Sequence, residues 1–348
     1  MAVGERDESG DSGVVSAVRD VLDGSLRARL GVTEDQNNLM GFLFVAPNVL
    51  MFSVFLLGPV LYAFYISFQE WSILRNAGTW VGLANYVDVL TPLPVQGGLT
   101  NLQLNTSVFT DPSVNLFWYS LKTTVIYAVG TVPLQIYGGL AVALMLDKRV
   151  RMKKAYRAAY FMPVMLSGAA SAVMWRWFLA ADGVINNFLE PIGELVGVQL
   201  AQNWAGNPSY ALGGVMLMAI WGGIGSNMIF FLAGLQNVPE ELYEAARIDG
   251  ASAWQRFRHV TWPNLGNTNF FVIVMAIIGA FQVFGIALVY SEGGPVYATT
   301  TIVLLIYQRA FEEGKMGVGA AMAFILFLII FAFSYHQYRH RQQEEVTY

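Results

Sequence analysis

Long apolar stretches separated by short polar segments make up most of this chain. A helix needs about 20 residues to cross a hydrocarbon core of about 30 Å. Six stretches reach that length, near 41–68, 116–146, 158–181, 210–235, 268–290 and 316–338. The apolar run at 299–306 is too short to cross, and we interpret it as an interfacial segment. The pattern predicts an all-α integral membrane protein with six transmembrane helices.

Both ends of the chain are polar. Residues 1–38 begin with an acidic run rich in glycine and serine, which lacks the basic start and apolar core of a signal peptide. We expect a partly disordered tail here, in which 14–30 has the spacing of an amphipathic surface helix. Residues 39–340 then form the transmembrane domain, and 341–348 form a short C-terminal tail.

The second half of the chain contains a polar island at 236–266, between two apolar stretches. Its first predicted helix begins at Pro239, has carboxylates near its positive end, and stops at Gly250, which can adopt a left-handed cap. A second helix is predicted from about 251 to 262, ended by Pro263. The island therefore predicts two short helices held between membrane spans.

Composition supports the membrane assignment. Of 348 residues, 55% are hydrophobic and 13% are charged, whereas a soluble domain has roughly a quarter charged residues. The absence of cysteine excludes disulfides and thiolate metal sites. The histidines, His259, His336 and His340, lie at or beyond span ends, so no histidine metal site is expected. The net charge of −4 gives no indication of a nucleic-acid partner.

Basic residues alternate between the predicted loops. The loop after the second span holds Lys148, Arg149, Arg151, Lys153, Lys154 and Arg157, and the island holds Arg247, Arg256 and Arg258. By contrast, 182–209 has no lysine or arginine, and 69–114 has only Arg75. Because basic loops stay in the cytoplasm, we predict a multi-pass protein of a prokaryotic cell membrane with the island and both termini cytoplasmic.

Several functional classes lack their expected signals. Apart from Arg176, interpreted as a snorkelling interfacial residue, we find essentially no ionisable residue within the spans, so an intramembrane catalytic site is not expected. No phosphate-binding loop for ATP is present. Broken helices and inverted repeats, which ion-coupled carriers use, are not evident. On composition alone, a gated pore for neutral solutes is the alternative that remains.

The island carries the motif that identifies a family. Glu244-Ala245-Ala246-x-x-Asp249-Gly250-Ala251, followed by Phe257 and Pro263, resembles the EAA loop of ABC importer permeases. Further matches are Gly234-Leu235-Gln236 before it, Gly293-Gly294-Pro295 with Thr299-Thr300 after it, and Val81-Gly82-Leu83, Arg157-x-x-x-Phe161-Met-Pro163, Trp175-x-Trp177 and Gly183-x-x-Asn186 upstream. Over roughly 40–340, the chain is similar to binding-protein-dependent sugar permeases of the maltose/glycerol-phosphate type, with the MalF-type ABC permease fold.

The resemblance implies a subunit without its own ATPase site or cofactor. The island would dock as a coupling helix on a separate cytoplasmic ATPase, which uses ATP and Mg²⁺. The coupling residues would be Glu240, Leu242, Tyr243, Glu244, Ala245, Ala246, Asp249, Gly250, Ala251 and Phe257. The complex would contain a second permease in an expected heterodimer, two ATPase copies, an extracytoplasmic solute-binding protein and the surrounding bilayer.

Two further surfaces follow from the resemblance. Candidates for the substrate path are Trp221, Ser226, Asn227, Phe281 and Gln282, although buried amides equally serve as bonds between helices. Candidates for docking the binding protein are Trp71, Trp80, Gly293, Gly294 and Pro295, although the tryptophans equally suit interfacial anchors. The scarcity of charge favours a sugar or oligosaccharide; glycerol phosphate, an amino acid or another small solute is the alternative.

Overall fold

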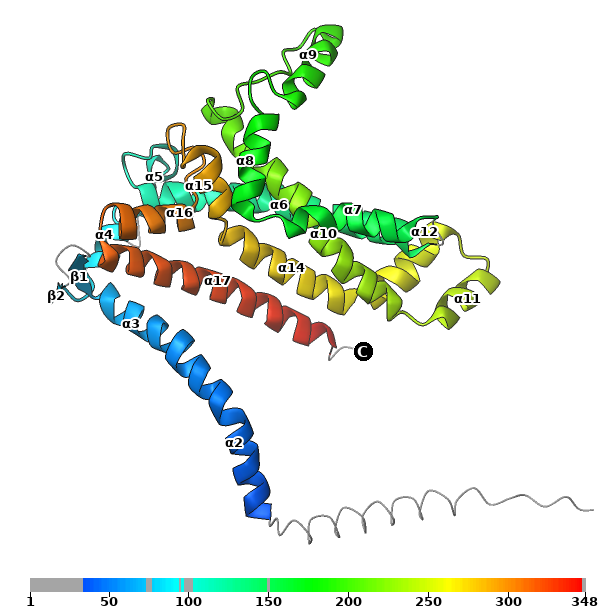
Figure 1. Ribbon diagram of the computed structural model, residues 1–348, viewed down its shortest axis with the longest axis horizontal. Helices are drawn as coiled ribbons and strands as arrows, with labels where there is room; N and C mark the ends of the chain where they lie inside the picture. Colours follow the sequence, from blue (N-terminus) through cyan, green and yellow to red (C-terminus); the bar gives the residue numbers. More distant parts are fainter. Residues whose placement is uncertain (1–33, 73–76, 94, 97–102, 149–150, 346–348) are drawn as a thin grey trace, which may run out of the picture. The chain divides into compact units, whose positions relative to one another are not determined.

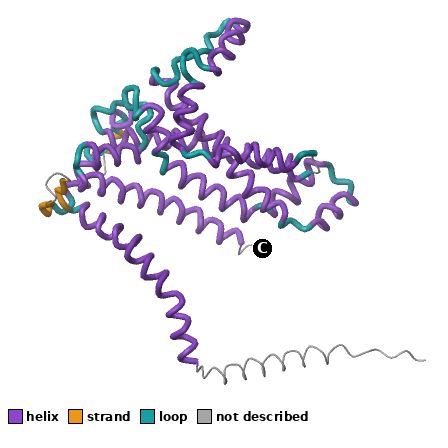
Figure 2. The backbone as a smooth tube through the Cα atoms, viewed as in Figure 1, coloured by secondary structure: helices purple, strands orange, loops and turns teal. Residues whose placement is uncertain are grey.

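The computed structural model describes residues 34–72, 77–93, 95–96, 103–148 and 151–345. The predicted surface helix at 14–30 and the last three residues lie outside the described residues. The chain divides into two compact units, Met1–Ala63 and Phe64–Tyr348. Described elements are almost all helices, and the strands occur as two short antiparallel pairs (Figure 2).

The first unit contains one long apolar helix. It comprises α2 (Glu34–Phe52), a π-helical turn at Ser53–Leu57 and α3 (Gly58–Ser67), whose last residues belong to the second unit. From Gly41 to Ser67 it is long and apolar enough to cross a membrane. Its apolar residues surround the helix instead of forming one stripe, as expected for a helix that faces lipid.

The second unit is a helical bundle (Figure 1). Its long helices are α6 (Leu116–Asp147), α10 (Pro208–Gln236), α14 (Gly266–Phe281) and α17 (Met316–Glu345). The shorter ones are α4 (Ala84–Leu90), α5 (Ser107–Thr110), α7 (Lys153–Met165), α8 (Gly168–Phe178), α9 (Val184–Val196), α11 (Glu240–Ile248), α12 (Ala253–Arg256), α13 (Trp262–Asn264), α15 (Gly285–Ser291) and α16 (Ile302–Tyr307).

Two short hairpins and two π-helical segments complete the unit. Strand β1 (Gln69–Ser72) pairs with β2 (Ala77–Trp80), with Gln69 opposite Trp80, and β3 (Val95–Gln96) pairs with β4 (Gln103–Leu104). The π-helical segments are Phe257–Thr261, between α12 and α13, and Gln308–Glu312, after α16.

The core of this unit is the crossing of α6 and α10. A Cβ on Gly139 of α6 would lie 2.6 Å from Asn227 Cβ and 2.9 Å from the Met228 nitrogen on α10. A Cβ on Gly225 would likewise collide with the Tyr160 carbonyl oxygen of α7. Because glycine has no side chain, the helix backbones approach closely at these positions. Close approach of this kind is how membrane helices gain packing energy. Residues such as Leu140, Val215 and Phe231 are buried around the crossing.

Four of the six predicted spans are continuous helices, but the other two are broken. Helices α7 and α8 meet at an angle of 100°, where a single span was predicted at 158–181. Pro163 lies in the last turn of α7, Leu166 is extended, and the Ser167 hydroxyl caps α8 by accepting a hydrogen bond from Ala170 N–H. The prediction that broken helices are absent is therefore wrong.

The predicted span at 268–290 is also interrupted. Helix α14 stops at Phe281 and α15 begins at Gly285, while the preceding segment Ala253–Asn264 bends by 69° into α14. Counted by length and apolarity among the described residues, four helices could cross a membrane, or six if each bent pair counts once. Hydropathy measures apolar content along the chain and therefore does not detect a change of direction.

The segment at 299–306 is interior, where we expected an interfacial position. Thr299, Thr300 and Thr301 are buried, and Ile302 and Leu305 of α16 join a second cluster with Phe117 of α6 and Met322 of α17. The Thr301 hydroxyl donates to the Val283 carbonyl at 2.9 Å, and Ile302 N–H donates to Thr124 Oγ1 at 2.9 Å. These bonds satisfy polar groups that would otherwise make burial costly.

One charged residue within the predicted spans was left out of the sequence interpretation. Lys122 lies within α6, so Arg176 is not alone in the spans. It is half-buried, and its ammonium nitrogen lies 4.1 Å from the centre of the Tyr119 ring. A cation–π contact of this kind partly offsets the loss of hydration.

We predict that Gly139→Ala lowers the thermal stability of the chain. The added methyl group would press on α10 backbone atoms, and overpacking of this kind costs about 1–3 kcal/mol. Gly213→Ala, on α10, is the matched control, because nothing lies within 4 Å of its Cβ position. The measurement is the unfolding midpoint of each purified variant in the same detergent. Equal midpoints for the two variants would show that the helices are not in close contact at Gly139.

Candidate functional site

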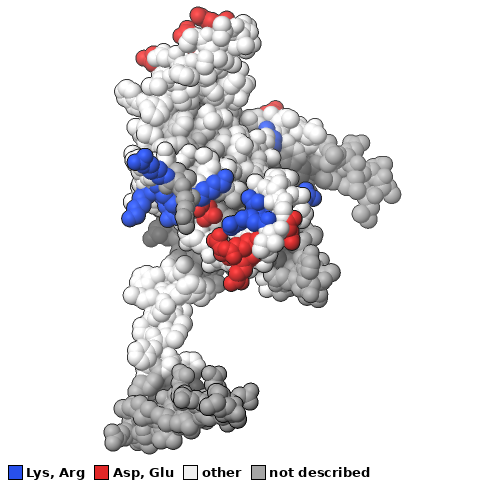
Figure 3. Space-filling view, turned by 90° about the vertical axis from the view of Figure 1, so that its right-hand side faces the viewer, with Lys and Arg blue, Asp and Glu red and all other residues white. Residues whose placement is uncertain are grey.

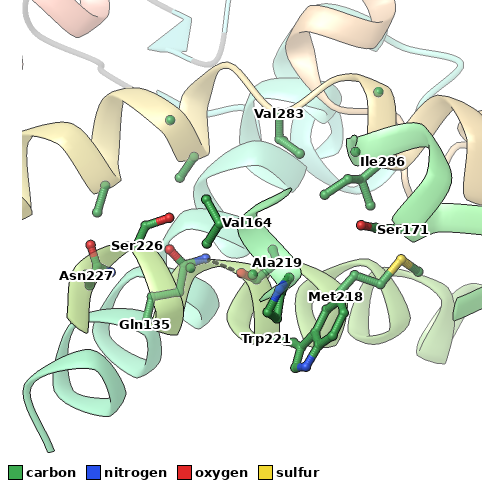
Figure 4. A pocket seen from close by; sticks show the side chains of 18 of the residues that line it. Gln135, Val164, Ser171, Met218, Ala219, Trp221, Ser226, Asn227, Val283 and Ile286 are labelled. Carbon is green, nitrogen blue, oxygen red and sulfur yellow. Dashed lines mark hydrogen bonds between the residues drawn. The ribbon is translucent and has the colours of Figure 1, made fainter. Parts of the chain in front are cut away.

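A cavity of about 520 Å³ lies beside the crossing of α6 and α10 (Figure 4). Its walls come from α6, the α7–α8 bend, α10, and the segment around the break between α14 and α15. The lining residues are Tyr127, Gln135, Pro163, Val164, Leu166, Gly168, Ser171, Met218, Ala219, Trp221, Gly222, Gly223, Ser226, Asn227, Phe230, Met275, Ala276, Gly279, Ala280, Val283, Phe284, Gly285 and Ile286. The volume suits a small organic ligand.

Both helix breaks contribute to the cavity. Leu166 and Gly168 come from the first break, and Val283, Phe284 and Gly285 come from the second. A broken helix leaves backbone amides and carbonyls without helical partners, and such groups line the solute sites of many membrane transporters. At these two breaks part of the backbone is paired within the bundle: Leu166 N–H donates to the Pro163 carbonyl, and the Val283 carbonyl accepts from the Thr301 hydroxyl.

The polar side chains of the cavity are neutral. The Gln135 amide donates a hydrogen bond to the Ala219 carbonyl at 3.1 Å, which links α6 to α10 (Figure 4). Ser171, Ser226 and Asn227 make no side-chain hydrogen bond within the described part of the chain, so their polar atoms remain available to a ligand. Among the described residues lining the cavity, none is Asp, Glu, Lys, Arg or His.

Three of the five predicted path residues line this cavity. Trp221, Ser226 and Asn227 do so, and the Trp221 ring lies edge to face with Trp175, 5.9 Å between centres. Phe281 and Gln282 do not. Phe281 packs in both hydrophobic clusters and Gln282 is exposed, because α14 ends there and the chain turns. Their assignment to the substrate path stays a prediction that this cavity does not support.

Sequence reasoning missed Gln135 and Ser171. Gln135 is the one amide side chain in α6 and follows Pro133 by two residues, so its isolation in an apolar helix was an available signal. A Cβ on Gly223 would overlap the Gln135 carboxamide, and this fit depends on the crossing of two helices. Ser171 could not be placed without knowing the bend before α8.

The polar island forms two helical segments, as predicted, but Pro263 does not end the second one: it lies in the first turn of α13, where its missing N–H is tolerated. Helix α11 has Glu240 and Glu241 in its first turn, and Gly250 follows it with φ of +74°. Ser252 and Gln255 form a capping box at the start of α12. The Tyr243 hydroxyl lies 3.0 Å from Thr261 Oγ1, which ties α11 to the π-helical segment. The island is thus held in a defined shape.

One face of α11 is open. Glu241, Glu244, Ala245 and Ile248 follow helical spacing and are exposed, with Ile248 86% exposed. Leu242 is also exposed, whereas Tyr243 and Ala246 are half-buried, and Phe257 packs against the main core. Arg247 and Glu240 form an ion pair of 3.1 Å that is too exposed to add much stability. Figure 3 views this end of the unit, where charged side chains of both signs gather.

The predicted docking residues lie on the paired strands β1 and β2 and in the turn after α15. Trp80, on β2, is 64% exposed and stacks on Phe68 at 5.5 Å, while Trp71 on β1 is half-buried. The Gly293 carbonyl accepts a hydrogen bond from the Thr300 hydroxyl, so Gly-Gly-Pro is an internal turn. Its exposed neighbours are Val296 and Tyr297, both with positive φ.

An ion-paired turn lies further along the chain, after α16. Glu313 accepts bonds from Arg309 at 2.7 and 2.8 Å and contacts Lys315 at 3.0 Å. Partial burial alone would raise the pKa of Glu313, but its bonds to the two cations lower the pKa below the ordinary value. This turn therefore stays charged at neutral pH.

Comparison with known proteins places the chain in a family. Residues 135–342 match the family described as "Binding-protein-dependent transport system inner membrane component". The chain is 34% identical over 294 residues to the probable ABC transporter permease protein YesP of Bacillus subtilis, covering 84% of this chain and 86% of that protein. It is 32% identical over 289 residues to the arabinooligosaccharides transport system permease protein AraP of Bacillus subtilis, covering 82% and 83%.

A solved structure shows the same fold. It is a bacterial alginate ABC transporter in complex with an alginate pentasaccharide-bound periplasmic protein, and the match has a TM-score of 0.67, with 19% identity and coverage of 88% of this chain and 96% of that one. At this sequence identity, the match supports a shared fold and nothing about function. Together with the two relatives and the broken-helix bundle, the family match shows that this chain belongs to the binding-protein-dependent transport system inner membrane components, the permease subunits of ABC importers.

Proposed function

We propose that this permease subunit forms half of the path for a neutral sugar or oligosaccharide. The observation that carries the proposal is the cavity: its amide and hydroxyl groups can bond sugar hydroxyls, and Trp221 offers an aromatic face. A charged solute such as glycerol phosphate would need a fixed counter-charge, and the described lining has none. The arabinooligosaccharide name of one relative supports this class of cargo.

The same proposal assigns α11 to coupling. Its open face, with Glu244, Ala245 and Ile248, would dock in a groove of a separate ATPase, which binds ATP and Mg²⁺. Small Ala245 allows a partner backbone to approach, and exposed Ile248 supplies an apolar anchor. The Tyr243–Thr261 bond would carry a movement of α11 to α14 through the bent segment before it.

We further propose six spans, counting each bent pair once, with both termini and the island in the cytoplasm. The basic residues between α6 and α7 support this orientation. The partners would be a second, different permease, two ATPase copies and an extracytoplasmic binding protein. The solved alginate complex supports the last of these partners. On this chain, Trp80, Val296 and Tyr297 are the exposed candidates for contact with the binding protein.

Gln135→Leu tests the path. Losing a neutral hydrogen bond costs about 1 kcal/mol, so we expect the substrate concentration for half-maximal uptake to rise by about five- to tenfold. The measurement is uptake of labelled oligosaccharide into proteoliposomes containing the complete importer. Gln282→Leu is the matched control, since Gln282 is outside the cavity, and it should change uptake less than twofold. If Gln282→Leu impairs uptake and Gln135→Leu does not, the cavity is not the path.

Glu244→Lys tests the coupling surface. Reversing a charge at a docked interface costs several kcal/mol, so uptake should fall by more than about tenfold while membrane insertion persists. Glu194→Lys on α9, also exposed and outside the island, is the control and should transport normally. The readouts are uptake and the stimulation of ATP hydrolysis by loaded binding protein. Unchanged transport by Glu244→Lys would refute the docking role of α11.

A further inference from the structure

A second hollow, of about 380 Å³, lies between α7 and the C-terminal half of α10. Its lining is Arg157, Ala158, Phe161, Met228, Ile229, Leu232, Ala233 and Gln236. The walls are apolar, and the two polar side chains, Arg157 and Gln236, belong to the ends of α7 and α10 that adjoin the basic loop and the island. We call this hollow the α7–α10 groove; it is separate from the cavity described above.

Arg157 needs an acceptor that the described chain does not supply. The side chain is half-buried, and its Nε is buried without a hydrogen-bond partner among the described residues. No carboxylate belongs to the described lining of the groove. A buried charged donor without a partner costs more than about 1–3 kcal/mol. An anion in the groove would remove that cost.

The start of α7 adds to the positive potential. Its first turn holds Lys153 and Lys154 and no acidic residue, and Met152 before it provides no side-chain cap. Cations at this position are unfavourable for the helix, because the helix dipole is already positive there. Lys153 Nζ donates to the Asp147 carbonyl oxygen at 3.4 Å, and no carboxylate pairs with either lysine among the described residues. The N–H groups of the helix start and these cations together make the region favourable for a phosphate. Figure 3 shows Lys and Arg side chains gathered at this end of the unit.

We propose that the α7–α10 groove binds one anionic phospholipid of the leaflet that faces the basic loop. Its phosphate would accept hydrogen bonds from Arg157, and an acyl chain would lie along Phe161, Ile229 and Leu232. A basic mouth combined with an apolar wall between membrane helices is the chemistry that selects an anionic over a zwitterionic lipid. The proposal depends on insertion in a bilayer and is independent of the solute transported.

The test compares Arg157, on α7, with Arg151, in the turn before it. Full-length chain in detergent is titrated with dioleoyl-phosphatidylglycerol or dioleoyl-phosphatidylcholine, and bound lipid is counted by native mass spectrometry. Arg157→Gln should weaken phosphatidylglycerol binding by about tenfold, as expected for one lost charge-assisted hydrogen bond. Arg151→Gln removes the same charge from an exposed side chain outside the groove and should weaken it less than twofold.

A second pair of variants tests the groove itself. Ala233→Trp fills the apolar wall and should abolish the specific adduct, whereas Ala155→Trp, exposed on α7 outside the groove, should not. Equal losses in Arg157→Gln and Arg151→Gln would show diffuse charge attraction and overturn the proposal. Equal binding of the two lipids would also overturn it. A combination of two results would also overturn the proposal: the Ala233→Cys variant cross-links to another protein chain in membranes, and the Ala233→Trp variant still binds phosphatidylglycerol.

Discussion

The close crossing of α6 and α10 is the constraint on which the rest of this structure depends. Gly139 and Gly223 remove the side chains that would separate the two helices, and Gln135 then reaches the Ala219 carbonyl. With these helices fixed, the space left beside them must be closed by other elements. The bent pair α7–α8 and the segment around the break between α14 and α15 close it.

This arrangement separates the proposed solute path from the proposed coupling surface. The described residues lining the cavity are uncharged, whereas charged side chains of both signs gather at the end of the unit that faces the viewer in Figure 3. Through the bend before α14, the island is continuous with the helix whose C-terminal end borders the cavity. A displacement of the proposed coupling helix therefore has a direct covalent route to the cavity wall.

Much of this organisation could be predicted from the sequence, for identifiable reasons. Helices α6 and α10 are long apolar stretches, and each follows an asparagine, Asn115 or Asn207, whose side chain caps it. The bounds of the first helix of the island could be predicted because Pro239 and Gly250 act on the local backbone conformation, without help from tertiary contacts. The α7–α8 bend could not be predicted, since Leu166 and Ser167 are unremarkable in a hydropathy profile. Gln282 lies outside the cavity and Gln135 lies in its wall, and the sequence could not separate them because which residues face a cavity depends on tertiary contacts.

In the proposed complex, α11 is the contact through which an external ATPase would drive this permease. Because the chain has no cysteine of its own, a single cysteine can be placed at Ala245, on the open face of α11, and cross-linked in native membranes. A product containing an ABC ATPase subunit is expected, and it should be absent when the cysteine is at Leu195 of α9 instead. A chain that inserts normally but yields no ATPase adduct from position 245 would contradict the claim.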